Sequence, residues 1–132
     1  MILSIRKARE SDIATIYQLI VIATKKGKIL LRSKAELKRT LRCFFVAESK
    51  NKLVGCCSIE VYNKKLAEVR SLTVHPKFQN HGIGSALVRR CIESARERKI
   101  YEVLVITDRP SLFKRYGFAE QLEGQFPLFL RP

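Results

Sequence analysis

Apolar and polar residues follow strand and helix periods along most of the chain. Alternating or β-branched apolar runs bounded by turn residues predict strands at 2–8, 43–48, 53–62, 66–75 and 101–107. Apolar residues that recur every three or four positions predict long amphipathic helices beginning near Ile13 and Ile83. Ser33 followed by Glu36 matches the capping box of a further helix. The pattern therefore predicts a protein that mixes strands and helices.

The connections between these elements follow from turn and capping residues. Ser11 or Asp12 is expected to cap the first helix, and Gly27 is expected to end it. The three strands between residues 43 and 75 are joined by short turns and predict an antiparallel meander. The strand–helix–strand unit that follows predicts two parallel neighbouring strands. The last segments are expected to be a short helix at 110–116 and two strands at 118–122 and 126–130.

Length and composition favour a single soluble domain spanning residues 1–132. The chain has 132 residues, of which 46% are hydrophobic, enough for one core. No apolar run is long enough to cross a bilayer, and no signal-peptide pattern is visible, so a cytoplasmic protein without a membrane partner is expected. The four cysteines show no metal-ligand spacing, and no metal is expected.

Charge is the unusual part of the composition. Lys and Arg number 26 against 12 Asp and Glu, which gives a formal net charge of +14. Such a field attracts any polyanion, including coenzyme A, acidic metabolites and nucleic acids. The basic residues are spread along the chain, and Phe44, Phe45, Phe113 and Phe118 fall in core-like runs, which disfavours a nucleic-acid-binding module.

The segment Gln79–Ser85 is the strongest candidate for a binding site. It lies between a predicted strand that stops at Pro76 and the basic amphipathic helix that begins near Ile83. The first N–H groups of a helix lack helical acceptors, and its dipole is positive at this end. Gly82 and Gly84 would let a phosphate approach the backbone closely, so the segment is predicted to bind an anion.

Gln79-x-x-Gly82-x-Gly84 after a strand ending Val74-His75-Pro76 resembles the pyrophosphate loop of the GNAT family of N-acetyltransferases. The predicted element order and Arg115-Tyr-Gly-Phe118 extend the resemblance over the chain. It implies an α+β (α/β three-layer) fold whose mixed, mostly antiparallel sheet contains a central, splayed parallel strand pair. It also implies that acetyl-CoA is held by the backbone of Leu72, Thr73, Val74, Gln79, Asn80, His81, Gly82, Ile83, Gly84 and Ser85.

Acetyl transfer to an amine needs a base and a way to stabilise the leaving thiolate. Glu68, six residues before Val74, matches a glutamate that several GNAT enzymes carry, and is the candidate base. It shares a strand face with Val74 unless a bulge intervenes. Phe113 stands where many members have an acidic tyrosine. Ser111 is the candidate substitute, although a helix-cap role is an alternative.

A closer resemblance concerns the substrate. Residues 27–37, 68–76 and 107–118 resemble the acetyltransferase domain of N-acetylglutamate synthase. This implies a small amine substrate, L-glutamate as the best candidate, and a place in arginine biosynthesis. The resemblance implies that Arg32 binds a substrate carboxylate, and Arg70 is a second candidate, since guanidinium groups pair bidentately with carboxylates. The 132 residues are not expected to include the amino-acid-kinase domain of typical bacterial synthases, so either a stand-alone short synthase or a GNAT paralogue with another small amine substrate is expected.

Other functions stay open from the sequence. One is acetylation of a protein N-terminus or lysine, which would require an open groove beside Gly27–Ser33. Another is a GNAT fold that binds coenzyme A without turnover, and a third is the basic nucleic-acid-binding module considered above. The acceptor, a homodimer and regulation by arginine are left undecided.

Overall fold

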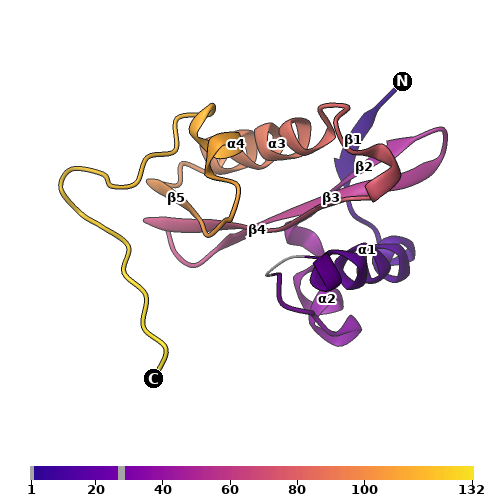
Figure 1. The fold of residues 1–132 in the computed structure, drawn as a ribbon, viewed down its shortest axis with the longest axis horizontal. Helices are drawn as coiled ribbons and strands as arrows, with labels where there is room; N and C mark the ends of the chain where they lie inside the picture. The colour runs from indigo at the N-terminus through magenta and orange to yellow at the C-terminus, as the bar shows by residue number, and fades with distance from the viewer. Residues whose placement is uncertain (1, 27–28) are drawn as a thin grey trace.

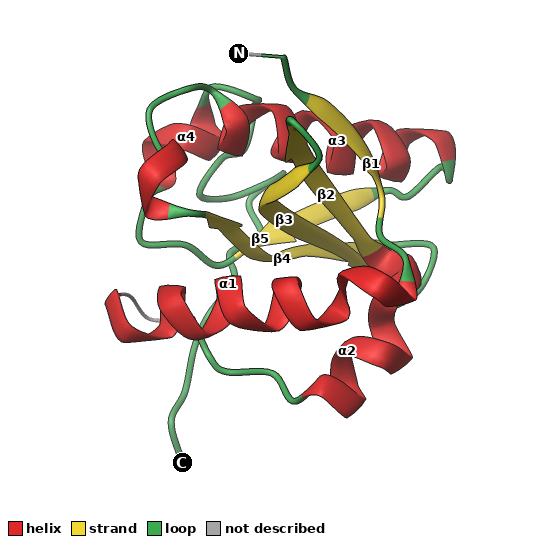
Figure 2. Cartoon of the chain, turned by 90° about the vertical axis from the view of Figure 1, so that its right-hand side faces the viewer, coloured by secondary structure: helices red, strands yellow, loops and turns green. Residues whose placement is uncertain are grey.

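The residues that the structure describes form a mixed sheet with helices on both faces. The computed structural model describes residues 2–26 and 29–132. In Figure 1, α1 and α2 lie on one side of the sheet and α3 and α4 on the other, and Figure 2 shows the same three layers from the side. The helices are α1 (Ile13–Lys26), α2 (Lys34–Thr40), α3 (Ile83–Glu97) and α4 (Pro110–Lys114). These layers confirm the predicted α+β architecture.

The sheet has the strand order β1-β2-β3-β4-β5. Its strands are β1 (Ser4–Lys7), β2 (Phe44–Ser49), β3 (Lys52–Val61), β4 (Leu66–Val74) and β5 (Glu102–Val105). The first four strands pair in antiparallel fashion, and β4 pairs with β5 in parallel. The long helix α3 is the crossover that makes this parallel pair possible. The predicted meander and the predicted parallel neighbours are both confirmed.

The C-terminal segment differs from the prediction. Residues 118–122 and 126–130 form no strands, and Leu122 and Gln125 make one isolated antiparallel bridge around a tight turn. The turn residues Glu123 and Gly124 have φ angles of 50° and 77°, as a hairpin turn requires. The turn forms, but apart from Phe118, which packs against the α3-side core, residues 119–132 are exposed. Consequently the parallel pair lies at an edge of the sheet, not at its centre.

Local sequence signals place the helix starts. The Ser33 hydroxyl accepts a hydrogen bond from the Glu36 N–H at 3.1 Å, so the predicted cap of α2 is present. Before α1, Asp12 instead ends a short 3₁₀ turn (Glu10–Asp12) and accepts from the Arg9 N–H at 2.7 Å. The predicted end of α1 at Gly27 lies outside the described residues. No helix among the described residues is both long and apolar enough to cross a membrane.

The two faces of the sheet bury separate apolar clusters. One cluster joins α3 and α4 to the sheet and includes Phe45, Ile59 and Leu87. The other joins α1 and α2 to the opposite face and includes Phe44 and Ile16. Adjacent residues Phe44 and Phe45 are both buried because successive strand residues point to opposite faces. A strand covered on both faces reads as a continuous apolar run, as β2 does.

A buried ion pair fastens the start of α1 to the sheet. The Arg6 guanidinium of β1 donates to both Asp12 carboxylate oxygens at 2.8 and 3.0 Å, and it also contacts Glu48. Asp12 is only 8% exposed. The hydrogen bonds from Arg6 lower the pKa of Asp12, although burial opposes this shift. The carboxylate therefore stabilises the fold in its ionised form.

Replacing Asp12 with asparagine is expected to lower the free energy of unfolding at pH 7 by about 2 kcal/mol, because Arg6 loses its main partner. Since the pKa of Asp12 is lower in the folded state, wild type loses this stabilisation as the pH falls below about 4, the unfolded value. Urea unfolding at pH 7 and pH 3 measures both effects. Glu10→Gln on the same turn is the control, and an equal loss in both variants would contradict the prediction.

Candidate active site

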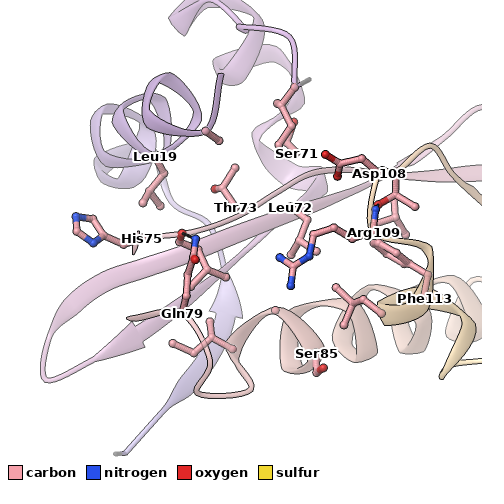
Figure 3. Close-up of a pocket in the computed structure, with 18 of the residues that line it drawn as sticks. Leu19, Ser71, Leu72, Thr73, His75, Gln79, Ser85, Asp108, Arg109 and Phe113 are labelled. Carbon is pink, nitrogen blue, oxygen red and sulfur yellow. Dashed lines mark hydrogen bonds between the residues drawn. The ribbon is translucent and has the colours of Figure 1, made fainter. Parts of the chain in front are cut away.

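The main pocket of the described chain opens where β4 and β5 end. Its volume is about 960 Å³, and its walls come from β4, the loop after β4, the first turn of α3, the β5–α4 segment and one side of α1. Figure 3 shows residues from β4, the loop and α4 around this space. The pocket therefore lies at the predicted anion-binding segment and between the predicted parallel strands.

The two parallel strands β4 and β5 pair over a short ladder and separate beyond it. Backbone pairing runs from Leu66 opposite Glu102 to Val69 opposite Val105 and stops there. β4 continues to Val74, while the chain after Val105 turns towards α4. The second half of β4 thus has no neighbour on this side within the described residues. This gap is the floor of the pocket, and it exposes strand N–H and C=O groups that a ligand could pair with.

A bulge in β4 coincides with this gap. The register with β3 shifts between Cys56 and Ser58, so that β4 carries one extra residue. Ser71 within the bulge has a φ of 56°, a left-handed conformation that is uncommon for serine. Before the bulge, Ala67 and Val69 pack towards α3, and after it Leu72 and Val74 do so. The extra residue therefore changes which positions face each side of the sheet.

The loop and the first turn of α3 form one end of the pocket. All but one of the residues predicted to hold the pyrophosphate line it: Gln79, Asn80, Gly82, Ile83, Gly84 and Ser85. Gly82 precedes α3 with a φ of 76°, which glycine adopts without strain. The first helical bond found here is from Ala86 N–H to Gly82 C=O at 3.1 Å. The preceding N–H groups are therefore available to an anion.

Gly84 and His81 differ in how they relate to the pocket. A side chain added at Gly84 would meet only a Val74 methyl group, at 3.9 Å, so the glycine leaves an open approach to the backbone. His81 does not line the pocket, and its Nδ1 lies 2.8 Å from the Gln79 carbonyl oxygen. The predicted contact of His81 with the ligand thus has no counterpart in the pocket wall.

Leu72, Thr73 and Val74, predicted to pair with the pantetheine arm, all line the pocket floor. Thr73 is 5% exposed, and its hydroxyl lies 3.1 Å from the Cys56 sulfur. Because this hydroxyl is engaged on the α1 side of the sheet, the strand presents mainly its backbone and the Leu72 and Val74 side chains to the gap.

Glu68 lies on the other face of β4 from Val74. The bulge at Ser71 interrupts the even spacing, so the condition for a shared face with Val74 is not met. Glu68 does not line the main pocket, and it accepts a hydrogen bond from the Tyr62 hydroxyl. The Glu68 carboxylate raises the pKa of Tyr62 to about 12. Glu68 is therefore placed on the α1–α2 side of the sheet, beside Arg70.

The two predicted arginines belong to one ion-pair network. Arg32 is 3% exposed and contacts Glu36 at 2.5 Å, Glu60 at 2.7 Å and Ser71 Oγ at 3.1 Å. Burial opposes the charge of Arg32, but the two carboxylates raise its pKa. Glu60 also accepts from Arg70 at 3.0 Å. Arg32 thus lies behind Ser71 and outside the pocket wall, whereas Arg70 is part of that wall.

The α4 region supplies different side chains from those expected. Ser111 is exposed and does not line the pocket, while Phe113 does and packs edge-on against Phe118. The Tyr116 hydroxyl donates to the Ser85 carbonyl oxygen at 3.2 Å and so fastens α4 to the first turn of α3. The pocket wall at this end is therefore apolar at Phe113, with no tyrosine hydroxyl.

Arg109 is one of the pocket residues that the sequence patterns did not single out. It precedes α4, lines the pocket, and its guanidinium projects between β4 and α3 in Figure 3. Among the described residues it forms no ion pair. Its signal was its place four residues after the end of β5 at Val105, next to the anion-binding loop. With Lys26, Arg70 and Arg115, it gives the pocket four cationic side chains.

Comparison with known proteins agrees with this geometry. The sequence profile described as an acetyltransferase (GNAT) domain matches residues 40–120. An amino-acid acetyltransferase of Mycobacterium tuberculosis is 39% identical over 124 residues, which cover 91% of this chain and 70% of that protein.

Two solved structures extend the similarity to the fold. A Mycobacterium tuberculosis protein in complex with CoA and the ligand denoted NLQ superposes with a TM-score of 0.83 at 36% identity, covering 90% of this chain and 73% of that chain. N-acetylglutamate synthase from Neisseria gonorrhoeae, complexed with coenzyme A and N-acetyl-glutamate, gives a TM-score of 0.85 at 29% identity. That match covers 96% of this chain but only 30% of the synthase chain.

Proposed function

This chain belongs to the GNAT acetyltransferase family, and we propose that it acts as a single domain that transfers the acetyl group of acetyl-CoA to the amine of a small amino acid, best represented by L-glutamate. The observation that carries this proposal is one pocket that combines a helix N-terminus, a split strand pair and three arginines. The relatives named for amino-acid acetylation and the neighbours complexed with CoA support it.

The chemical groups of acetyl-CoA determine the orientation that we propose for it in the pocket. Its diphosphate needs N–H donors and positive potential, which the first turn of α3 supplies. Its pantetheine arm carries amide groups that pair with an open strand, and β4 offers Leu72 to Val74 beside the gap. The thioester would then lie in the gap beside the second half of β4. We assign the Val74 N–H as a donor to the thioester oxygen, following the family.

The acceptor is expected on the α1–α2 side of β4. Arg70 is 36% exposed, and its bond to Glu60 uses one of five N–H donors. Arg70 is therefore the cation on this side that we assign to a substrate carboxylate, and we assign Arg109 to the same carboxylate from across the gap between β4 and β5. Direct contact with Arg32 would require its ion pairs with Glu36 and Glu60 to open. We assign Arg32 to holding Ser71 and Glu60 in place.

Glu68 remains our candidate base. It lies on the same face of β4 as Arg70, so a substrate bound by Arg70 would present its amine on this side of the sheet. In the reaction the amine nitrogen bonds the acetyl carbon, its proton passes to the carboxylate directly or through water, and the carbon–sulfur bond breaks. A thiolate leaves without strong acid help, so Ser111, which lies outside the pocket wall, is not required in this scheme.

Replacing Arg70 or Arg109 with alanine is expected to raise the KM for glutamate about tenfold or more, because a charge-assisted bond worth about 1.5–3 kcal/mol is lost. The KM for acetyl-CoA should change less in Arg70→Ala than in Arg109→Ala, since Arg109 also faces the cofactor gap. Steady-state kinetics with each substrate varied gives both values. Arg96→Ala on the exposed side of α3 is the control.

A direct test of the function is incubation with acetyl-CoA and a panel of amino acids and peptides, while free thiol is followed. Thiol release with glutamate and formation of N-acetylglutamate would support the proposal. Release only with peptides would overturn the amino-acid acceptor and favour protein acetylation.

A further inference from the structure

Residues 119–132 form an extended tail that leaves the body of the protein. Its anchor is Phe118, which packs edge-on against Phe113 with the ring centroids 5.5 Å apart. Beyond this anchor every residue is exposed, and Figure 1 shows the tail in yellow, clear of the sheet and the helices. Among the described residues, no backbone hydrogen bond joins residues 119–132 to the rest of the chain.

The end of this tail has the composition of a buried strand. Phe126, Leu128, Phe129 and Leu130 are 64%, 89%, 73% and 86% exposed. Soluble proteins rarely leave several large apolar side chains together in water unless another surface covers them. Aromatic and aliphatic residues at such spacing pack well in a strand that is covered on both faces. The segment 126–130 is therefore a strand that lacks a sheet in this structure.

The sheet offers a free edge of matching character at β5. This strand is the last of the sheet, and within the described chain it pairs only with β4. Tyr101 and Ile106, at the two ends of β5, are 68% and 58% exposed. A strand edge with unpaired N–H and C=O groups and apolar neighbours is a template for a further strand.

The position of Pro127 is compatible with such pairing. Successive residues of a strand direct their backbone N–H and C=O groups to alternate sides. If residues 126, 128 and 130 bond to the edge of β5, Pro127 faces outward, where its missing N–H has no partner to satisfy. Proline occurs in outermost strands in this orientation.

The charge of the tail suits contact with a second copy of this chain. Two copies with a formal net charge of +14 repel each other over most of their surface. Residues 116–130 contain no Lys or Arg, and they include Glu120 and Glu123. Glu120 already pairs with Lys114 at 2.9 Å. The tail is therefore a segment that can approach a basic copy without adding repulsion.

The surface involved is large enough for a stable dimer. At about 100–200 Å² for each large apolar side chain, two tails and the two surfaces that they cover would bury about 1,200–2,500 Å². Specific protein interfaces bury about 1,200–2,000 Å². A two-fold arrangement uses each tail and each β5 edge once, so no edge is left open for further growth.

We propose that two copies of the chain exchange their tails, so that residues 126–130 of each copy pair with the free edge of β5 in the other. Val105 and Ile106 at the end of β5 line the main pocket. The exchanged tail would thus lie next to the pocket wall and support it. The exchange concerns assembly and does not depend on which amine is acetylated.

The mass of the protein in solution is the first test. Light scattering after size-exclusion chromatography is expected to give twice the 15.2 kDa of one chain at about 10 μM. Leu128→Glu combined with Leu130→Glu is expected to raise the dimer Kd by at least about 100-fold and to give monomers. Both side chains are exposed within one copy, so the variant should fold normally, as circular dichroism would show.

Gln121→Glu combined with Gln125→Glu is the matched control. It adds the same charge to exposed positions of the same tail outside the segment 126–130, and it should stay dimeric. Persistence of the dimer in the leucine variant would place the contact elsewhere and overturn the exchange. Loss of the dimer in both variants would mean that charge alone decides assembly, and would also overturn it.

Hydrogen exchange shows where the tail binds. Backbone amides of residues 102–106 and 126–130 are expected to be protected together in wild type and to lose protection together in the leucine variant, while α3 is unchanged. A wild-type monomer with an unprotected tail would overturn the proposal. A monomer in which both segments are protected would show that the tail pairs with the β5 edge of its own copy, and would overturn the exchange as well.

Discussion

Gly84→Asp is expected to reduce affinity for acetyl-CoA by at least about 100-fold while leaving α3 folded. The new carboxylate would stand in the first turn of α3, where the ligand diphosphate is proposed to bind, and repulsion at close range costs about 3 kcal/mol. The same carboxylate interacts favourably with the helix dipole, so helix stability should not fall. Calorimetry with coenzyme A measures the affinity, and thermal unfolding followed by circular dichroism measures the fold.

Gly84→Ala is the matched control. Its methyl group would meet only Val74 at 3.9 Å, an ordinary contact, so that binding should weaken far less than in the aspartate variant. Equal losses in the two variants would mean that space, not charge, decides binding at this position. Retained binding in Gly84→Asp would remove the diphosphate from the first turn of α3.

Glu68→Gln is expected to lower kcat about 100- to 1,000-fold with little change in the KM for acetyl-CoA. Glutamine keeps the size of the side chain and can still accept a hydrogen bond from Tyr62, but it cannot take a proton from the amine. The residual rate should rise with pH, because the free amine then forms in solution without help. Initial rates between pH 6 and pH 10 give this dependence.

Glu102→Gln on the neighbouring strand is the control for this variant, since Glu102 lies at the start of the β4–β5 ladder, away from the pocket. Its activity should equal that of wild type. Unchanged turnover in Glu68→Gln at neutral pH would remove Glu68 as the base, without affecting the assignment of the pocket to acetyl-CoA.

Elements with a strong local signal were predictable from the sequence. The apolar period of α3 and the cap at Ser33 depend on neighbouring residues, and both are present. The C-terminal strands were wrong because a turn such as Glu123-Gly124 forms locally, whereas strand pairing needs a partner edge that no local pattern reveals.

The site was predictable to the extent that it is built from backbone. Gly82, Gly84 and the strand before them fix the loop, and nearly all its predicted residues line the pocket. The predicted side-chain roles assumed that every second residue of β4 faces the same side of the sheet. The bulge at Ser71 changes which residues face each side. The ion pairs that bury Arg32 come from β3 and α2, distant in sequence, so no spacing rule pointed to them.

The extra residue in β4 separates the requirements for the two substrates. Even-numbered positions before Ser71, such as Arg70, face the acceptor side of the sheet, and even-numbered positions after it, such as Leu72, face the side where the acyl donor is proposed to bind. Protein engineers could therefore alter the range of amines through the first half of one strand and the length of the acyl chain through the second. Alterations on the two sides should combine additively where the changed positions are more than about 10 Å apart and share no partner.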